Sequence, residues 1–209
     1  MKDPKKCGDI IRAIRKATSL PVSAKIRLGV DNQHINYLDV IRELENAGVS
    51  FIAIHARTAK ELYSGSPHFD MLQNLRKKMS VPLIISGNIF TLEDAIKAQE
   101  ITGADFVMVA RGAVGNPYLI TQISEYFNSG VVLPSPSFAE QKKYCLELLR
   151  SLIEEKGEEK AVTVFRSMGP AFFFNLPNVK ILKRRISSEI TSYQSVVDII
   201  EEFEKEHIS

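Results

Sequence analysis

The chain has 209 residues, of which 44% are hydrophobic and 25% charged, and its formal net charge is +2. This balance is typical of a soluble globular protein and excludes collagen-like, disordered and disulfide-rich classes. No stretch approaches the roughly 18 apolar residues of a membrane span, and the N-terminus MKDPKKCGDI lacks the apolar core of a secretory signal. Cys7 and Cys145 have no metal-binding spacing, so we expect a reducing, cytoplasmic compartment and no metal site.

The charges are distributed unevenly along the chain. Residues 1–30 hold eight lysines and arginines against two aspartates, and residues 189–209 hold one lysine against six acids. Residues 160–188 carry six bases, no acid and four phenylalanines. Such runs are usually solvated helix faces, but a basic segment of this kind also suits contact with a phosphate backbone.

In chain order, the first 130 residues alternate between helix and strand patterns. Asp3-Pro4 predicts a capped helix start and Thr91–Asp94 a capping box, while Gly48 and Gly103 predict helix ends. The predicted helices lie near 4–17, 35–48, 69–79, 91–102 and 117–127, and the predicted strands at 22–28, 51–55, 83–86 and 106–110. Short apolar strands that alternate with helices predict a parallel sheet with right-handed crossovers.

The segment GVVLPSPSF at 130–138 predicts a linker, and Ser137 is placed to cap the next helix. The remainder contains helical patterns and no convincing strand. Leu146, Leu149 and Ile153 form one apolar helical stripe, and further helices are expected at 160–168, 178–187 and 192–206. The sequence therefore predicts an α/β region followed by an all-α helical region.

Polar or glycine-containing groups follow all four predicted strands. They are Lys25 and Arg27; His55 and Arg57; Ser86-Gly87-Asn88; and Ala110-Arg111-Gly112. In a parallel sheet or barrel, ligands bind at the C-terminal ends of the strands. Four such ends in series predict a binding site there.

The residue types narrow the ligand of this site. Gly87 and Gly112 expose backbone N–H groups after the third and fourth strands, which favours an anion such as phosphate. Lys25 adds a positive charge and His55 a hydrogen-bonding ring. This set suits flavin mononucleotide or a phosphorylated sugar. The alternatives are an interior salt bridge for Lys25 and plain turn geometry for the glycines.

Several motifs resemble the tRNA-dihydrouridine synthase family. They are KIRLG at 25–29, HART at 55–58, ELYSGS at 61–66, SGNI at 86–89 and ARGAVGNPYL at 110–119, and the resemblance extends to about residue 187. Family members are flavin-dependent reductases with a TIM barrel and a C-terminal helical domain. The resemblance implies a partial TIM barrel with about four parallel strands over 1–130 and a helical tRNA-binding domain over 137–209.

The resemblance also implies site residues and a reaction. Lys25 and His55 match residues that contact the flavin ring and its ribityl chain, and the FMN phosphate is expected at Ser86, Gly87, Asn88, Ala110 and Arg111. The family's turns more commonly read Asn-Gly-Asp and Gly-Arg, so Ser86, Asn88 and Ala110 are mild departures. In the family, NADPH reduces FMN, which transfers hydride to C6 of a tRNA uridine while a cysteine protonates C5.

A complete TIM barrel has eight strands and about 250 residues, twice the number of strands predicted here. The family's cysteine lies in an Asn-x-x-Cys-Pro loop, and neither Cys7 nor Cys145 precedes a proline. We therefore expect no catalytic residue in this chain, no uridine reduction by the chain alone and reduced FMN affinity. The expected partner is the missing N-terminal half of the barrel or a second copy.

The basic residues of the helical region are expected to contact tRNA phosphates, which position RNA without reading its sequence. They are Arg166, Lys180, Lys183, Arg184 and Arg185. Ile181, Leu182 and Ile186 should face the core, as should Phe172–Phe174. One alternative is a basic face paired with the acidic helix at 189–209. Two others concern the whole chain: a catalytically silent tRNA-binding fragment, or another FMN- or phosphate-binding barrel enzyme.

Overall fold

The protein is described by a computed structural model that covers residues 2–208. Its contacts divide it into two compact units, one through Arg111 and one from Gly112 onward. This division lies ahead of the linker expected at 130–138. The first unit contains α1(Pro4–Ala17), β1(Ser23–Arg27), α2(Tyr37–Asn46), β2(Phe51–His55), η1(Phe69–Leu72), η2(Leu75–Lys78), β3(Leu83–Ser86), α3(Leu92–Thr102) and β4(Phe106–Met108).

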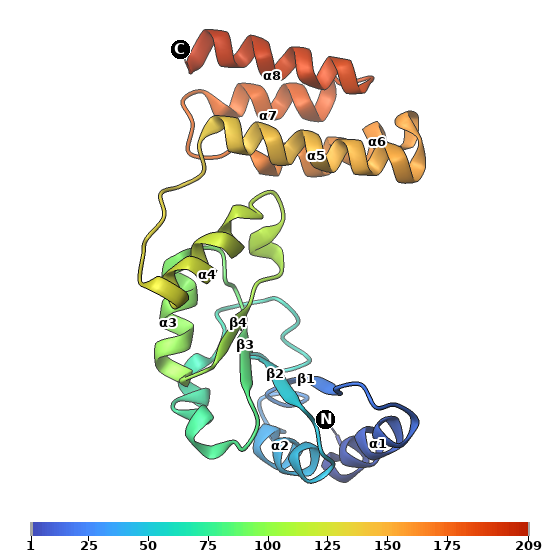
Figure 1. Ribbon diagram of the computed structural model, residues 1–209, viewed down its shortest axis with the longest axis vertical. Coiled ribbons are helices and arrows are strands. Elements are labelled where there is room, and N and C mark those ends of the chain that lie inside the picture. The colour runs from blue at the N-terminus through green and yellow to red at the C-terminus, as the bar shows by residue number, and fades with distance from the viewer. Residues whose placement is uncertain (1, 209) are drawn as a thin grey trace. The chain divides into compact units, whose positions relative to one another are not determined.

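The first unit is built on one parallel sheet with strand order β1-β2-β3-β4 (Figure 1). Arg27 pairs with His55, His55 with Ser86, and Ser86 with Met108, so one row of residues crosses the sheet at its C-terminal end. The predicted fold class is confirmed: this is the arrangement expected of part of a (β/α)8 barrel. The register also brings the residues after each strand to one edge.

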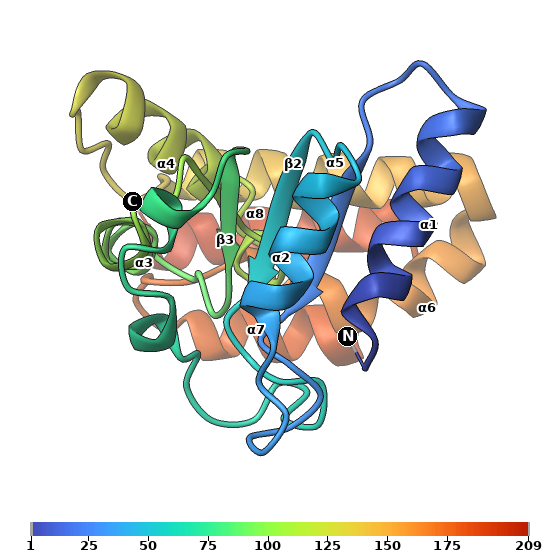
Figure 2. The same ribbon diagram turned by 90° about the horizontal axis from the view of Figure 1, so that it is seen from below.

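Helices cover one side of this sheet. α2 packs on β1, α3 packs on β3 and β4, and α1 lies beside α2 (Figure 2). The strand residues Ile52, Ile54, Leu83 and Ile85 are fully buried. The predicted caps are present, because Asp3 accepts from the Lys6 N–H and Thr91 forms the capping box with Asp94.

The prediction of one continuous helix over 69–79 is wrong. The apolar stripe is buried as expected, with Leu72 and Leu75 at 1% and 2% exposure, but the segment forms two short 3-10 helices, η1 and η2. Asn74 between them adopts a left-handed conformation with φ 53° and donates its backbone N–H to Ile101 O at 2.9 Å. An α-helix cannot continue through this residue, because its N–H is taken by a distant carbonyl.

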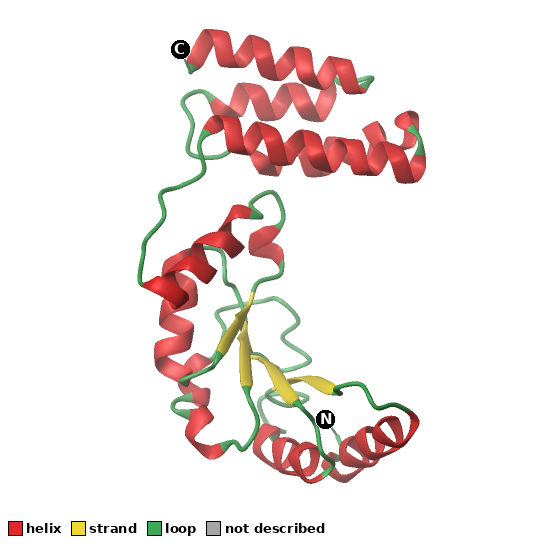
Figure 3. Ribbon diagram, viewed as in Figure 1, coloured by secondary structure: helices red, strands yellow, loops and turns green. Residues whose placement is uncertain are grey.

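The second unit consists of helices and loops, with no strand among its described residues (Figure 3). It contains η3(Arg111–Ala113) at its boundary, followed by α4(Tyr118–Ser129), α5(Phe138–Lys156), α6(Glu158–Met168), η4(Gly169–Phe172), α7(Val179–Ser188) and α8(Tyr193–His207). Ser137 caps α5 in a capping box with Glu140, as its position predicted. No helix among residues 2–208 is long and apolar enough to cross a membrane.

The helices from α5 onward share a hydrophobic core. Phe173, Leu182 and Ile186 are fully buried and Phe172 nearly so, which confirms their predicted inward positions. Ile181 is 44% exposed, so the expectation that it faces the core is wrong. It lies next to Leu182 on a helix with a narrow buried stripe, and only one of two adjacent positions can face inward.

Candidate functional site

Four cations surround His55 at the C-terminal end of the sheet. His55 ends β2 and is only 7% exposed. Burial, together with the charges of Arg27, Lys25, Arg57 and Arg111, lowers the pKa of His55 to about 4. The ring is therefore neutral at neutral pH. The structure thus gathers the strand-end residues into one strongly positive cluster.

The neutral form of His55 can be assigned from its neighbour. Arg57 Nη1 lies 3.4 Å from His55 Nε2. A guanidinium only donates, so Nε2 accepts and the ring proton lies on Nδ1. Lys25, by contrast, is exposed on β1, and partial burial with the charge of Arg27 lowers its pKa. The site therefore offers one neutral imidazole donor beside a flexible ammonium group.

Arg57 is completely buried and organises the loop that follows β2. Its Nε donates to Ser64 O at 3.1 Å, its Nη2 donates to Gly65 O, and its Nη1 donates to Asn88 Oδ1 at 3.2 Å. These acceptors are carbonyl oxygens, which satisfy the donors of a buried guanidinium without a counter-charge. The positive charge of Arg57 is therefore left to act on the site.

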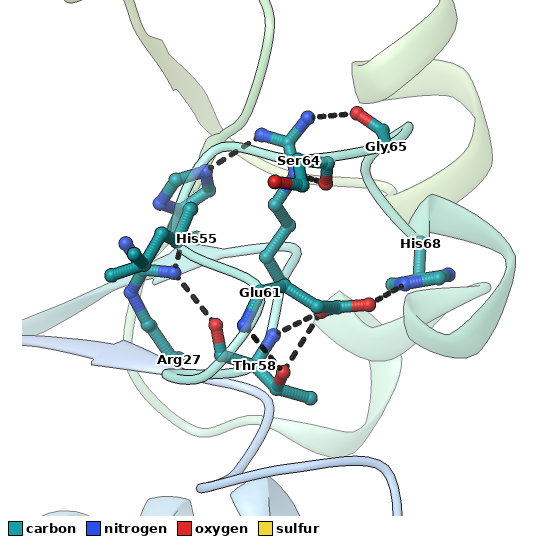
Figure 4. Close-up of polar contacts among 9 residues, drawn as sticks. Arg27, His55, Thr58, Glu61, Ser64, Gly65 and His68 are labelled. Carbon is teal, nitrogen blue, oxygen red and sulfur yellow. Dashed lines mark hydrogen bonds and ion pairs between the residues drawn. The ribbon is translucent and has the colours of Figure 1, made fainter.

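Arg27 and Glu61 hold the same loop from its other side (Figure 4). Arg27 Nη1 donates to Thr58 O at 2.7 Å and to Leu62 O at 3.0 Å. Glu61 accepts from the Thr58 N–H at 2.6 Å and lies 2.7 Å from His68 Nε2. The hydrogen bonds from His68 and Thr58 lower the pKa of Glu61 to about 2. The loop is thus fixed at its start, middle and end.

Asn88 and Arg111 connect the third and fourth strand ends. Asn88 adopts φ 46°, and its Oδ1 accepts from Arg111 Nη2 at 2.8 Å as well as from Arg57. The Arg111 guanidinium lies over the ring of Tyr63, 4.6 Å from its centroid, and 5.5 Å from that of Phe90. The side chain of Asn88 therefore joins two of the four cations.

Gly87 forms the turn after β3, with φ 142°. A Cβ at this position would lie 3.0 Å from Pro67 Cβ and 3.4 Å from His55 Cδ2. Within residues 2–208, the backbone N–H groups of Gly87 and Asn88 have no protein acceptor. Two available N–H donors beside a cation cluster form a suitable cradle for an anion.

Neither cysteine belongs to a strand end or to the turn that follows one. Cys145 is fully buried in α5, and burial raises the pKa of its thiol far above the ordinary value. Cys7 lies in α1. Among the described residues, no group of three or more histidine, cysteine or acidic side chains is arranged to hold a metal ion.

The predicted RNA-contacting residues differ in their surroundings. Arg185 is ion-paired with Glu189 at 3.0 Å and Glu202 at 2.8 Å, as the alternative of a paired basic face requires. Arg166 Nη2 donates to Ile190 O at 2.7 Å. Lys180, Lys183 and Arg184 form no ion pair within the part of the chain that the structure describes. Among the five residues, Arg185 is therefore the one whose charge is offset by ion pairs.

Sequence reasoning did not assign roles to several residues of the site. Arg27 and Arg57 were noted at the strand ends, but their function as loop clamps depends on carbonyls up to 35 residues away. Glu61 and Tyr63 lie within the ELYSGS motif, and Phe90 directly follows SGNI. Their positions in or beside these motifs were the sequence features that could have identified them as site residues.

Comparisons with known proteins point to one family. The family model for dihydrouridine synthase (Dus) matches residues 1–207. A "Probable tRNA-dihydrouridine synthase" from Rickettsia bellii is 33% identical over 178 residues, which is 85% of this chain and 55% of that protein. The "tRNA-dihydrouridine synthase B" of Shewanella oneidensis is 32% identical over 166 residues, or 79% of this chain and 52% of that protein.

The chain spans about half the length of these curated relatives. Among solved structures, a "putative dihydrodipicolinate synthase family protein" from Coccidioides immitis aligns with 95% of this chain and 70% of its own, with a TM-score of 0.44 and 14% identity. A likeness this weak carries no argument about the fold.

Proposed function

Because the chain belongs to the dihydrouridine synthase family, we propose that it forms the FMN-binding part of an enzyme that reduces uridine to 5,6-dihydrouridine in tRNA. The observation that supports this most is the convergence of Lys25, His55, the Gly87 turn and Arg111 at one edge of the sheet. NADPH is the proposed reductant. When bound, FMN supplies the hydride that reaches C6 of the uridine.

The strand-end turns fit a phosphate group. We assign the FMN phosphate to the backbone of Ser86-Gly87-Asn88 and of Ala110-Arg111. The N–H groups of Gly87 and Asn88 have no acceptor within residues 2–208, and a Cβ at Gly87 would crowd Pro67. The charges of Arg57 and Arg111 lower the cost of holding a dianion there. Available backbone N–H groups with arginine charge nearby are groups that bind a phosphate.

Lys25 and His55 are assigned to the flavin ring and its ribityl chain. His55 is neutral, so its Nδ1–H can donate to a carbonyl or hydroxyl oxygen without adding a fifth charge to the cluster. The ammonium group of Lys25 is exposed on the adjacent strand and can turn toward an electron-rich ring edge. Both contacts orient the cofactor rather than transform it.

We assign no catalytic acid to these 209 residues. Cys145 is buried in the helical unit with a raised pKa, and Cys7 belongs to α1 and is not followed by a proline. General acid catalysis typically contributes about 10²–10⁴-fold in rate. We therefore propose that the chain alone does not reduce uridine, and that the missing N-terminal half or a second copy supplies the rest of the active site.

The helical region over 137–209 is proposed as the tRNA-binding domain. Lys180, Lys183 and Arg184 present unpaired charge on one helix, which suits phosphate contact. Arg166 and Arg185 are proposed to support this surface through their contacts with Ile190 and the acidic residues. A chain with two cysteines and no metal-binding spacing between them supports a cytoplasmic site of action.

The proposal is tested by titrating FMN into the full chain and following flavin fluorescence. Saturable quenching is expected, weaker than in a complete family member. Gly87→Ala should weaken binding severalfold, because its Cβ would lie 3.0 Å from Pro67 Cβ in a turn with φ 142°. Gly130→Ala is the matched control, since Gly130 also has positive φ but nothing within 4 Å of an added Cβ. Absent quenching, or equal effects of both substitutions, would contradict the FMN site.

A second candidate is a catalytically silent fragment that retains tRNA binding. The unpaired basic residues of α7 favour it independently of the cofactor site. Binding of tRNA without any flavin binding would support this candidate. The family match leaves an unrelated phosphate-binding barrel enzyme without support.

A further inference from the structure

Two large aromatic rings are exposed at the edge of the cation cluster, and the proposed cofactor contacts do not use them. Tyr63 is 61% exposed and Phe90 is 45% exposed. The guanidinium of Arg111 lies over both rings, at 4.6 and 5.5 Å from their centroids. Tyr63 also lies 6.4 Å from the ring of His55. The two rings and the Arg111 guanidinium extend the site from the strand ends toward solvent.

The backbone that carries Tyr63 is held in a demanding conformation. Leu62 has φ 52°, which is unfavourable for a branched side chain and persists only where the surroundings enforce it. Arg27 donates to Leu62 O and Arg57 to Ser64 O, so the residues on both sides of Tyr63 are clamped. The loop thereby fixes the position of an exposed ring.

The guanidinium of Arg111 is also fixed. Its Nη2 donates to Asn88 Oδ1 at 2.8 Å, and Asn88 is held in turn by the buried Arg57. A flat cation and two flat rings are therefore arranged before any ligand arrives. Preorganised groups of this kind reduce the entropy cost of binding.

We propose that Tyr63, Phe90 and Arg111 form a stacking platform for an unpaired base of the substrate RNA. Unpaired bases stack on aromatic rings and on arginine planes, while nearby positive charge binds the attached phosphates. The inference rests on the proposed function in taking RNA as the substrate. It adds a base-binding surface to a site whose other contacts are assigned to the cofactor.

Exposure favours an RNA base over the flavin ring as the occupant. Of the two residues assigned to the flavin, His55 is 7% exposed and Lys25 lies on the neighbouring strand, whereas Tyr63 and Phe90 lie in loops beyond the strand ends and are largely open to solvent. A ligand that arrives with a long polymer needs a contact surface at the rim. A flavin that stays bound needs one in the interior.

The test uses the full chain and a short single-stranded RNA that contains one 2-aminopurine, whose fluorescence is quenched on stacking. Quenching is expected with the unsubstituted chain. Tyr63→Leu and Phe90→Leu should each weaken binding by about fivefold or more and reduce the quenching. The slope of log K against log salt should stay constant, because no cation is removed. Phe127→Leu is the control, since Phe127 is an exposed ring of α4 at 40% exposure.

A parallel FMN titration separates the two proposals. RNA quenching by the unsubstituted chain without FMN binding would contradict the proposed cofactor site and leave the platform standing. Loss of FMN binding in Tyr63→Leu with unchanged RNA binding would assign the rings to the flavin and overturn the platform. Absent quenching, or equal quenching in all three variants, would also overturn it. Circular dichroism verifies that each variant is folded.

Discussion

Arg57 and Arg111 share a single hydrogen-bond acceptor, the side-chain oxygen of Asn88, at 3.2 and 2.8 Å. Arg57 is buried after β2 and Arg111 follows β4, so one amide oxygen joins non-adjacent strand ends across the site. The two guanidinium charges repel each other, and this repulsion is offset by the shared acceptor and by any anion that binds beside them. The arrangement therefore favours an anionic ligand.

Replacing Asn88 should destabilise the first unit. Asn88→Ala removes the shared acceptor and leaves a donor of the buried Arg57 unsatisfied, a loss of about 1–3 kcal/mol. The measurement is urea unfolding followed by circular dichroism. Asn175→Ala is the control, because Asn175 has a similar positive φ of 56° and is exposed. An equal loss in both variants would attribute the effect to backbone conformation alone.

Stability should fall as the pH is lowered from 6.5 to about 4, in part because of His55. The pKa of His55 is lowered from 6.5 to about 4 in the folded chain, so the unfolded chain binds more protons in this window. The stabilising contribution is complete above pH 6.5 and lost by about 4, and amounts to roughly 3 kcal/mol. His55→Gln should remove this part of the pH dependence. An unchanged pH profile in that variant would show that His55 is not the titrating group.

Glu61 should control the order of the loop over 56–68. Glu61→Gln weakens its bonds to the Thr58 N–H and to His68, so amide exchange at Thr58 should accelerate at neutral pH. The pKa of Glu61 is lowered to about 2, so its stabilisation is present above 4.5 and lost as the pH falls toward 2. Glu100→Gln, in the exposed part of α3, is the control for charge alone. Identical exchange at Thr58 in both variants would contradict this role.

The salt dependence of tRNA binding should distinguish neighbouring cations on α7. Changing Lys180, Lys183 and Arg184 to Gln should reduce the slope of log K against log salt by up to about 2.7, or 0.9 for each duplex phosphate contact. Arg185→Gln alone should change the slope little, because Glu189 and Glu202 already neutralise this side chain. No change from the triple variant would favour a basic face without RNA contacts, and a large change from Arg185→Gln would show that its ion pairs with Glu189 and Glu202 do not keep it from the RNA.

The sequence by itself determined the order of the elements and the edge at which the site lies. Alternating apolar strands and helices require a parallel sheet, and parallel strands bring their C-terminal ends together, so Lys25, His55 and Gly87 had to meet at one edge. The helix caps at Asp3 and Ser137 could also be predicted from the sequence, since each depends on a contact between residues three positions apart.

The tertiary structure decided what those residues do to one another. The break at Asn74 depends on Ile101 O, and the clamp on Leu62 depends on Arg27, each a contact between distant segments. The lowered pKa of His55 likewise depends on burial and on four cations that come from three strand ends. Periodicity and propensity report only local preferences, whereas hydrogen bonds across the fold and the summed field of several charges exist only after the chain has packed.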